Sequence, residues 1–288
     1  MNPFVFRGYD QAALDHQMSA RGTVPDIGPF VEAYAAESAR CRATLPCHVG
    51  VPYGPKPEER LDIFPAAGGG AAPVFVFIHG GYWRALDAAD SSFMAETFTR
   101  AGLCVVAINY GLAPATSLRE IVRQCRAAMG WIRAHIARYG GDPSHLHVSG
   151  SSAGGHLAAA MLSPGWQAAA GFDGASLRSA SVLSGLHDLE PVQKSNCNDW
   201  LNLDPDEARA LSPIHALPER SIPLVVAYAP NETEEFKRQS EVYAAACAAR
   251  GCAVEILVPP GTNHFTLPLV FMEPGHALTR AVLATMGR

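Results

Sequence analysis

The chain has 288 residues, of which 48% are hydrophobic, and it carries a formal net charge of −5. This length and composition suffice for one large core, so we expect a single α/β domain over residues 1–288. Lysines and arginines are scattered singly along the chain. The sequence therefore lacks the basic stripe of proteins that bind nucleic acid or an anionic membrane.

No targeting or metal-binding pattern is visible. The first residues lack an apolar segment after a basic one, and no apolar run approaches 18 residues, so we expect neither a signal peptide nor a membrane-spanning helix. The seven cysteines form no Cys-x-x-Cys pair, and the eleven histidines show no His-x-x-x-His spacing. These features predict reduced, mostly buried cysteines in a cytoplasmic protein, without a metal site.

Residues 1–46 are polar and predict two short helices, over 9–18 and 29–40, without a strand. We expect them to pack over the domain as part of a lid, although an ordinary N-terminal extension has the same pattern. Two predicted strands follow at 47–53 and 60–64, on either side of a Gly-Pro-Lys-Pro turn. This arrangement is typical of a hairpin at a sheet edge.

From residue 73 onward, predicted strands alternate with predicted helices. The strands lie at 73–78, 104–108, 145–148, 180–185, 224–228 and 254–258, and the helices at about 91–101, 118–139, 157–162, 234–250 and 276–286. Such alternation predicts a mostly parallel central sheet with helices on both faces. Residues 188–221 are polar and contain prolines, and we expect a second piece of the lid there.

The stretch 148–156 contains Gly150-x-Ser152-x-Gly154 between a predicted strand and a predicted helix. In that context the pattern is typical of a nucleophile elbow, a tight turn whose central residue has a strained backbone. Flanking glycines let strand and helix approach, and Ser152 Oγ would lie at the tip, beside the positive end of the helix. A turn without catalytic function can show the same five residues. Whether Ser152 is catalytic therefore depends on the other groups that a serine hydrolase needs.

The run His79-Gly80-Gly81-Tyr82-Trp83 directly follows the strand at 73–78. A glycine pair at a strand end can turn backbone N–H groups toward a substrate oxygen. We therefore expect an oxyanion hole formed by the N–H groups of Gly81, Tyr82 and Ala153, with a plain glycine turn as the alternative. We also expect Tyr82 and Trp83 to contact the substrate. His79 precedes the usual Ser–acid–His order, which favours a structural role.

The candidate general base is His264, in the loop after the last predicted strand, because the carboxyl ends of parallel strands share one edge of the sheet. His276 is the only later histidine, and it opens the final helix. We favour His264 over His276.

The candidate acid is Glu232, in the loop between the strand at 224–228 and the next helix. Glu234 and Glu235 fall in the first helical turn, where carboxylates are common because of the helix dipole alone. Asp188 remains an alternative, since it follows the strand at 180–185 and some hydrolases take their acid from that position.

The run 79–83 and the elbow resemble the kynurenine formamidase (arylformamidase) group of α/β-hydrolases, which is close to the hormone-sensitive-lipase-like esterases. Residues 184–189, 235–240 and 263–265 fit the same group, and the resemblance runs from about residue 50 to the end, with a weaker match at 9–21. It implies the α/β-hydrolase fold, a Ser–acid–His triad and no cofactor. Eukaryotic formamidases have an aspartate where this chain has Glu232, and bacterial relatives include enzymes acting on simple esters and on other formamides.

We therefore expect a serine hydrolase in which Ser152 attacks a carbonyl, His264 accepts its proton and Glu232 orients the imidazole. Tyr82 stands where many related esterases have a third glycine, which favours small formyl- or acetyl-type acyl groups. The expected substrate is a small-molecule amide, as in an arylformamidase, or alternatively a short-chain ester. A non-catalytic binding protein of the same fold is the remaining alternative, and the sequence leaves a homodimer open.

Overall fold

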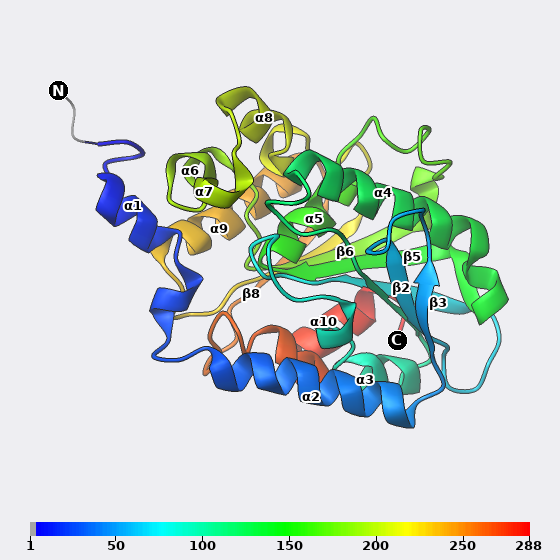
Figure 1. Ribbon diagram of the computed structural model, residues 1–288. Helices are drawn as coiled ribbons and strands as arrows, with labels where there is room; N and C mark the ends of the chain where they lie inside the picture. Colours follow the sequence, from blue (N-terminus) through cyan, green and yellow to red (C-terminus); the bar gives the residue numbers. More distant parts are fainter. Residues whose placement is uncertain (1–3) are drawn as a thin grey trace.

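The computed structural model describes residues 4–288, and an eight-stranded sheet forms its centre (Figure 1). The strand order is β1-β2-β4-β3-β5-β6-β7-β8. Pairs β1–β2 and β2–β4 are antiparallel, and the other pairs are parallel. The mostly parallel sheet and the edge hairpin are therefore confirmed. The strands are β1 His48–Pro52, β2 Arg60–Phe64, β3 Ala72–Ile78, β4 Cys104–Ile108, β5 Gly141–Ser151, β6 Leu177–Leu183, β7 Pro223–Ala227 and β8 Ala253–Leu257.

Helices cover both faces of the sheet (Figure 1). The side chains of β3 divide between the two cores, because Val76 packs on one face and Phe75 on the other. The core on the Val76 face includes residues of α4 Leu118–His135, α5 Ala153–Leu162 and α9 Glu234–Ala249. The core on the Phe75 face includes residues of α2 Gly28–Thr44, α3 Ala95–Arg100 and α10 Ala277–Thr285.

The helix expected over 91–101 is shorter than predicted. Residues 91–94 instead form a bend and a turn after the 3-10 turn η2 Ala88–Asp90, and α3 begins only at Ala95. The hydroxyl of Ser91 donates to Asp87 O, while the N–H of Ser92 donates to Ser38 Oγ on α2. The contact with α2 thus takes the place of the expected first turn of the helix. A local sequence pattern cannot predict this contact, because the two segments are far apart in the chain.

The two segments that were expected to form a lid are helical, and they contact each other. Residues 4–46 form α1 Gln11–Gln17, η1 Ala20–Thr23 and α2, while the first three residues of this segment lie outside the described part of the chain. Residues 188–221 form α6 Glu190–Lys194, α7 Asn198–Leu201, α8 Pro205–Ala210 and η5 Pro213–His215. Gln11 Nε2 donates to Lys194 O at 2.9 Å, so α1 is joined directly to α6 (Figure 1).

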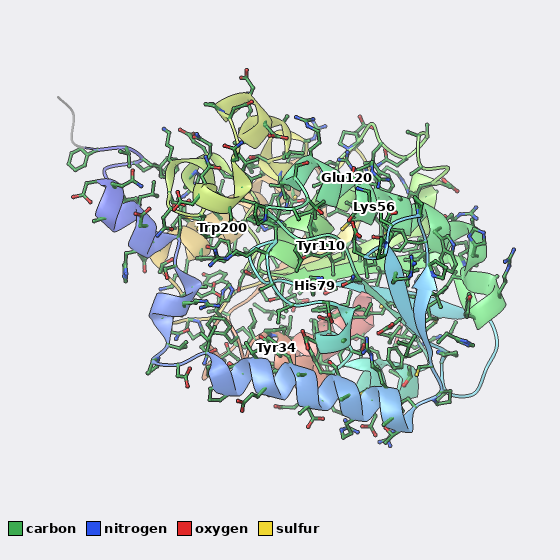
Figure 2. All side chains as sticks on the ribbon, viewed as in Figure 1. Tyr34, Lys56, His79, Tyr110, Glu120 and Trp200 are labelled. Carbon is green, nitrogen blue, oxygen red and sulfur yellow. The ribbon has the colours of Figure 1, made fainter. Side chains whose placement is uncertain are left out.

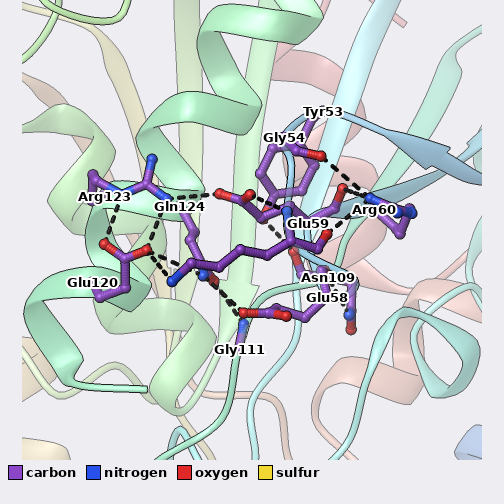
Figure 3. A network of polar contacts seen from close by, with 11 residues as sticks. Tyr53, Gly54, Glu58, Glu59, Arg60, Asn109, Gly111, Glu120, Arg123 and Gln124 are labelled. Carbon is purple, nitrogen blue, oxygen red and sulfur yellow. Dashed lines mark hydrogen bonds and ion pairs between the residues drawn. The ribbon is translucent and has the colours of Figure 1, made fainter. Parts of the chain in front are cut away.

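A network of polar contacts ties the turn between β1 and β2 to α4 (Figure 3). At its centre, the fully buried Glu59 accepts hydrogen bonds from the N–H of Lys56 at 2.9 Å and from Arg123 Nη2 at 2.7 Å. A Cβ on Gly54 would lie 2.3 Å from Glu59 Oε2, so a larger residue there would displace this carboxylate. The antiparallel edge of the sheet is thereby fixed to the helical layer.

In the part of the chain that the structure describes, no helix combines the length and the apolar character needed to cross a membrane.

Candidate active site

Ser152 occupies the tight turn between the end of β5 at Ser151 and the start of α5 at Ala153. Its backbone has φ +59° and ψ −122°, a conformation that costs a non-glycine residue about 1–3 kcal/mol. Two backbone hydrogen bonds hold it, from Ser152 N to Leu183 O at 2.8 Å and from His156 N to Ser152 O at 3.1 Å. This is the strained strand–turn–helix geometry that the Gly-x-Ser-x-Gly pattern predicts.

Glycines make the turn sterically possible. A Cβ on Gly154 would lie 2.0 Å from Ile78 O, and a Cβ on Gly150 would lie 2.1 Å from Gly154 O. Both neighbours are backbone atoms, which cannot move aside as a flexible side chain could. The start of α5 therefore approaches the end of β3 only because these positions have no side chain.

His264 lies in the loop after β8, and its Nδ1 is 2.8 Å from Glu232 Oε1. His264 is 4% exposed and Glu232 is 3% exposed, so the pair is shielded from water. Because a carboxylate can only accept, Nδ1–H is the donor and Nε2 keeps its lone pair. The hydroxyl of Ser184, at the end of β6, donates to the same Oε1.

The other candidate acids are engaged elsewhere. Glu235 and Asp188 both face Arg238 Nη2, at 2.6 and 3.5 Å. Glu234 pairs with Lys237 at 3.0 Å and is mostly exposed. Glu232 is therefore the acid that the structure brings to the imidazole of His264.

The two other histidines considered in the sequence have structural contacts. His276 caps α10 by accepting the N–H of Leu278 at 3.2 Å. His79 is buried, stacks on Tyr110 at 4.0 Å between ring centroids (Figure 2) and donates from Nδ1 to Gly80 O at 2.9 Å. Burial lowers the pKa of His79 to about 4, so the neutral ring braces the loop.

The loop after β3 turns sharply, with φ of +95° at Gly81 and +51° at Tyr82. A Cβ on Gly81 would lie 2.2 Å from Ala85 O, which explains the glycine there. Among residues 4–288, no acceptor pairs with the backbone N–H groups of Gly81, Tyr82 or Ala153. Three unpaired donors therefore lie on the loop and at the N-terminus of α5, where an oxyanion hole is expected.

Residues 4–46 and residues 188–221 both contact Tyr82 of this loop. The Tyr82 hydroxyl donates to Met18 O in the N-terminal segment, and Trp200 Nε1 on α7 donates to Tyr82 O at 3.1 Å. Figure 2 shows Trp200 in the region of α6 and α7. The sequence analysis did not identify Trp200 as a functional residue. The one feature that could have indicated it is that Trp200 is an isolated aromatic residue in a polar segment.

The structure corrects the expected position of Trp83. Its side chain is fully buried and packs edge to face on His156, with ring centroids 5.2 Å apart. It does not belong to the lining of the cavity described below. Trp83 belongs to the turn after β3 and has a positive φ of +58°. Its indole lies in the core on the α5 face of the sheet. The position of Trp83 therefore does not support the predicted substrate contact.

A cavity of about 370 Å³ lies over the elbow and is lined by Ser152, His264, Gly81 and Tyr82. Residues 4–46 and residues 188–221 both contribute to its wall. No hydrogen bond among residues 4–288 joins Ser152 Oγ to His264, and such bonds often form only once a substrate is bound. The lining residues from segments 4–46 and 188–221, together with the apolar lining residues from elsewhere, are Met18, Ser19, Ala20, Arg21, Ile27, Val31, Tyr34, Phe77, Ala85, Leu86, Phe93, Asn196, Cys197, Trp200, Phe265 and Pro268.

Helix α2 also supports the loop that carries the imidazole. The hydroxyl of Tyr34 on α2 donates to Phe265 O, next to His264 (Figure 2). The rings of Phe30 and Phe265 stack at 5.8 Å. In residues 4–288, no group of three or more His, Cys, Asp or Glu side chains is placed to hold a metal ion.

Comparisons with known proteins agree with this architecture. A family model described as BD-FAE matches residues 61–179. The chain is 30% identical to the kynurenine formamidase of Salmo salar, with 98% of this chain and 95% of that protein covered. A solved structure from Silicibacter sp. TM1040 matches with a TM-score of 0.82 at 24% identity, covering 96% of this chain and 99% of that one. A Pyrobaculum calidifontis esterase matches with a TM-score of 0.71 at 20% identity, covering 91% and 93%. The two structures confirm the α/β-hydrolase fold.

The elbow glycines lead to a prediction about stability. Gly154→Ala should lower the free energy of unfolding by roughly 2–3 kcal/mol, because its methyl group meets backbone oxygens that cannot move. This clash exceeds the gain of about 1 kcal/mol in helix propensity on replacing glycine by alanine. The measurement is urea unfolding followed by circular dichroism. Gly275→Ala is the control, because a Cβ there meets no atom within 4 Å. Equal stability of the two variants would contradict the close approach.

Proposed function

The chain belongs to the kynurenine formamidase family of α/β-hydrolases, and we propose that Ser152, His264 and Glu232 form its catalytic triad. The chain is a serine hydrolase that acts on small acyl amides or esters. The observation that carries the proposal is the buried His264–Glu232 hydrogen bond at the wall of the cavity that Ser152 also lines.

In the first step, Ser152 Oγ attacks the carbonyl carbon while its proton passes to Nε2 of His264. The imidazole becomes a cation, and the charge of Glu232, 2.8 Å from Nδ1, stabilises it. The pair is buried, so water screens this attraction little. The Ser184 hydroxyl, in the neighbouring loop after β6, holds the carboxylate in place.

The negative charge that develops on the carbonyl oxygen is stabilised by the N–H groups of Gly81, Tyr82 and Ala153. These donors need no reorganisation during the reaction, because the loop and the N-terminus of α5 already fix them. When the tetrahedral intermediate collapses, His264 returns the proton to the leaving amine or alcohol. An acyl ester on Ser152 remains, and water activated by the same imidazole hydrolyses it.

For the substrate, we favour the formamide of an aromatic amine. The similar protein of Salmo salar is named a kynurenine formamidase, and the cavity wall contains aromatic side chains against which an aryl group can pack. The Tyr82 ring is fixed between Met18 and Trp200, so it restricts the space beside the oxyanion hole to a small acyl group. A short-chain ester is the second candidate, because the structure of the Pyrobaculum calidifontis esterase shares the fold.

We also propose that residues 4–46 and 188–221 act as a two-part lid, because both line the cavity and both contact the Tyr82 residue. We propose a cytoplasmic location. The seven cysteines of the chain are free, and most of them are buried, as expected of a protein in a reducing compartment.

The proposal is tested with Ser152→Ala on an N-formyl aryl amine and on phenyl acetate. The variant should lose about 10⁴- to 10⁶-fold in kcat on whichever substrate is cleaved, because only the oxyanion hole and substrate binding remain. Ser151→Ala is the matched control and should retain most of the activity. If Ser151→Ala were inactive and Ser152→Ala active, Ser152 would not be the nucleophile.

A second prediction concerns the acid. Glu232→Gln keeps the shape of the side chain but permits the wrong imidazole tautomer, so kcat should fall by about 10⁴-fold. Asp188→Asn is the control, since Asp188 faces Arg238 and not the imidazole. Steady-state kinetics of both variants at one pH provide the measurement. Larger damage from Asp188→Asn than from Glu232→Gln would assign the acid to Asp188.

A third prediction concerns Trp200. Trp200→Phe removes the N–H that holds Tyr82 O, so the oxyanion donors become less fixed, and kcat should fall about three- to tenfold with little change in KM. Trp166→Phe is the matched control, because in residues 4–288 no acceptor pairs with Trp166 Nε1. A rise in KM at unchanged kcat would mean that Trp200 acts only in binding.

A further inference from the structure

A second cavity, of about 700 Å³, lies between α4 and the segments 163–170 and 210–216. It shares no lining residue with the cavity over Ser152. Its volume is in the range of pockets that hold small organic molecules. We propose that this cavity binds a small organic monocarboxylate with an apolar body, and that the carboxylate contacts Arg126. The site is separate from the proposed active site, so the inference does not depend on the proposed function.

Three arginines of α4 and no acidic residue line this cavity. Two of the arginines are already paired with carboxylates outside it. Arg119 Nε lies 3.1 Å from Glu207 Oε1, and Arg123 Nη2 lies 2.7 Å from Glu59 Oε1 (Figure 3). Among residues 4–288, Arg126 forms no ion pair and donates no side-chain hydrogen bond. The cavity therefore has one positive charge that no acidic residue compensates.

The environment of Arg126 makes this missing partner costly. The side chain is half-buried, and its Nε is enclosed without a hydrogen-bond acceptor. Burial lowers the pKa of Arg126, because the guanidinium loses water around it and gains no carboxylate. Its terminal nitrogens, Nη1 and Nη2, are not enclosed in this way. A carboxylate that enters the cavity can thus accept their N–H groups and compensate the charge.

The rest of the wall suits an apolar body that contains a ring. The Trp166 ring centroid lies 5.8 Å from the guanidinium carbon of Arg126, and Trp166 Nε1 is buried without an acceptor. Trp166 is held by stacking on Phe172, with ring centroids 5.1 Å apart. Pro164 and Pro213 add rigid apolar surface to the same wall. One uncompensated cation beside an apolar wall matches a single carboxylate on an apolar molecule better than it matches a multiply charged phosphate.

The test uses two ligands that have nearly the same shape and differ in charge, 3-phenylpropanoate and 3-phenylpropanamide. The chain has four tryptophans, so an NMR spectrum of the isotope-labelled protein contains four indole N–H signals. Trp166 reports on this cavity, and Trp200 reports on the cavity over Ser152. Single Trp→Phe variants assign the signals, and titration of each ligand against the Trp166 signal gives its affinity for this cavity.

We expect 3-phenylpropanoate to shift the Trp166 signal until it saturates, with an affinity about tenfold higher than that of the amide. Arg126→Gln should reduce this ratio to about one. Arg126→Lys should give an intermediate ratio, because it keeps the charge and loses the planar fork. Arg133→Gln is the matched control and should leave the ratio unchanged, because Arg133 lies on the same helix outside both cavities.

Ala169→Glu is a second variant, and it retains Arg126. Ala169 is an exposed residue of the cavity wall, so the substitution should leave folding intact, which circular dichroism checks for each variant. The added negative charge should weaken binding of the carboxylate about threefold without weakening binding of the amide. The inference is overturned if the carboxylate does not move the Trp166 signal or if both ligands bind equally well. It is also overturned if the ratio is unchanged in both Arg126→Gln and Ala169→Glu.

Discussion

The structure depends on one backbone constraint, the positive φ of Ser152 at the junction of β5 and α5. The turn is possible because Gly150 and Gly154 have no side chain. The start of α5 can therefore approach the backbone at the ends of β3 and β5. That approach places the first N–H groups of α5 beside the loop that follows β3. A wider turn would leave Ser152 and the unpaired donors of Gly81 and Tyr82 on separate parts of the surface. The strain is thus compensated by the packing of the whole central sheet.

Four neighbouring strands then assemble the remaining groups. Strands β5, β6, β7 and β8 are adjacent in the sheet, and Ser152, Ser184, Glu232 and His264 each follow the end of one of them. The central hydrogen bond, from His264 to Glu232, joins the last two of these loops. Because it is buried and supported by Ser184, the imidazole has one tautomer and one orientation.

Structural features that have a steric or topological cause could be predicted from the sequence. The glycine spacing predicts the elbow at Ser152, and the rule that strand ends share one edge predicts the pairing of Glu232 with His264. Trp83 was misplaced because nothing in the run 79–83 shows that the turn directs its indole into the core. Trp200 was missed because its contact with Tyr82 O joins residues 118 positions apart without any periodic pattern. Contacts between lid and loop are tertiary, and local propensity carries no information about them.

The central claim is that the folded structure, and not the serine alone, makes Ser152 nucleophilic. Its most direct measurement is labelling with a fluorophosphonate, with the modified residue identified by peptide mass spectrometry. The account predicts one adduct, on Ser152, in the native protein and none after unfolding in urea, because unfolding separates the serine from the His264–Glu232 pair. An adduct on a different residue, or labelling that persists in the unfolded protein, would contradict it.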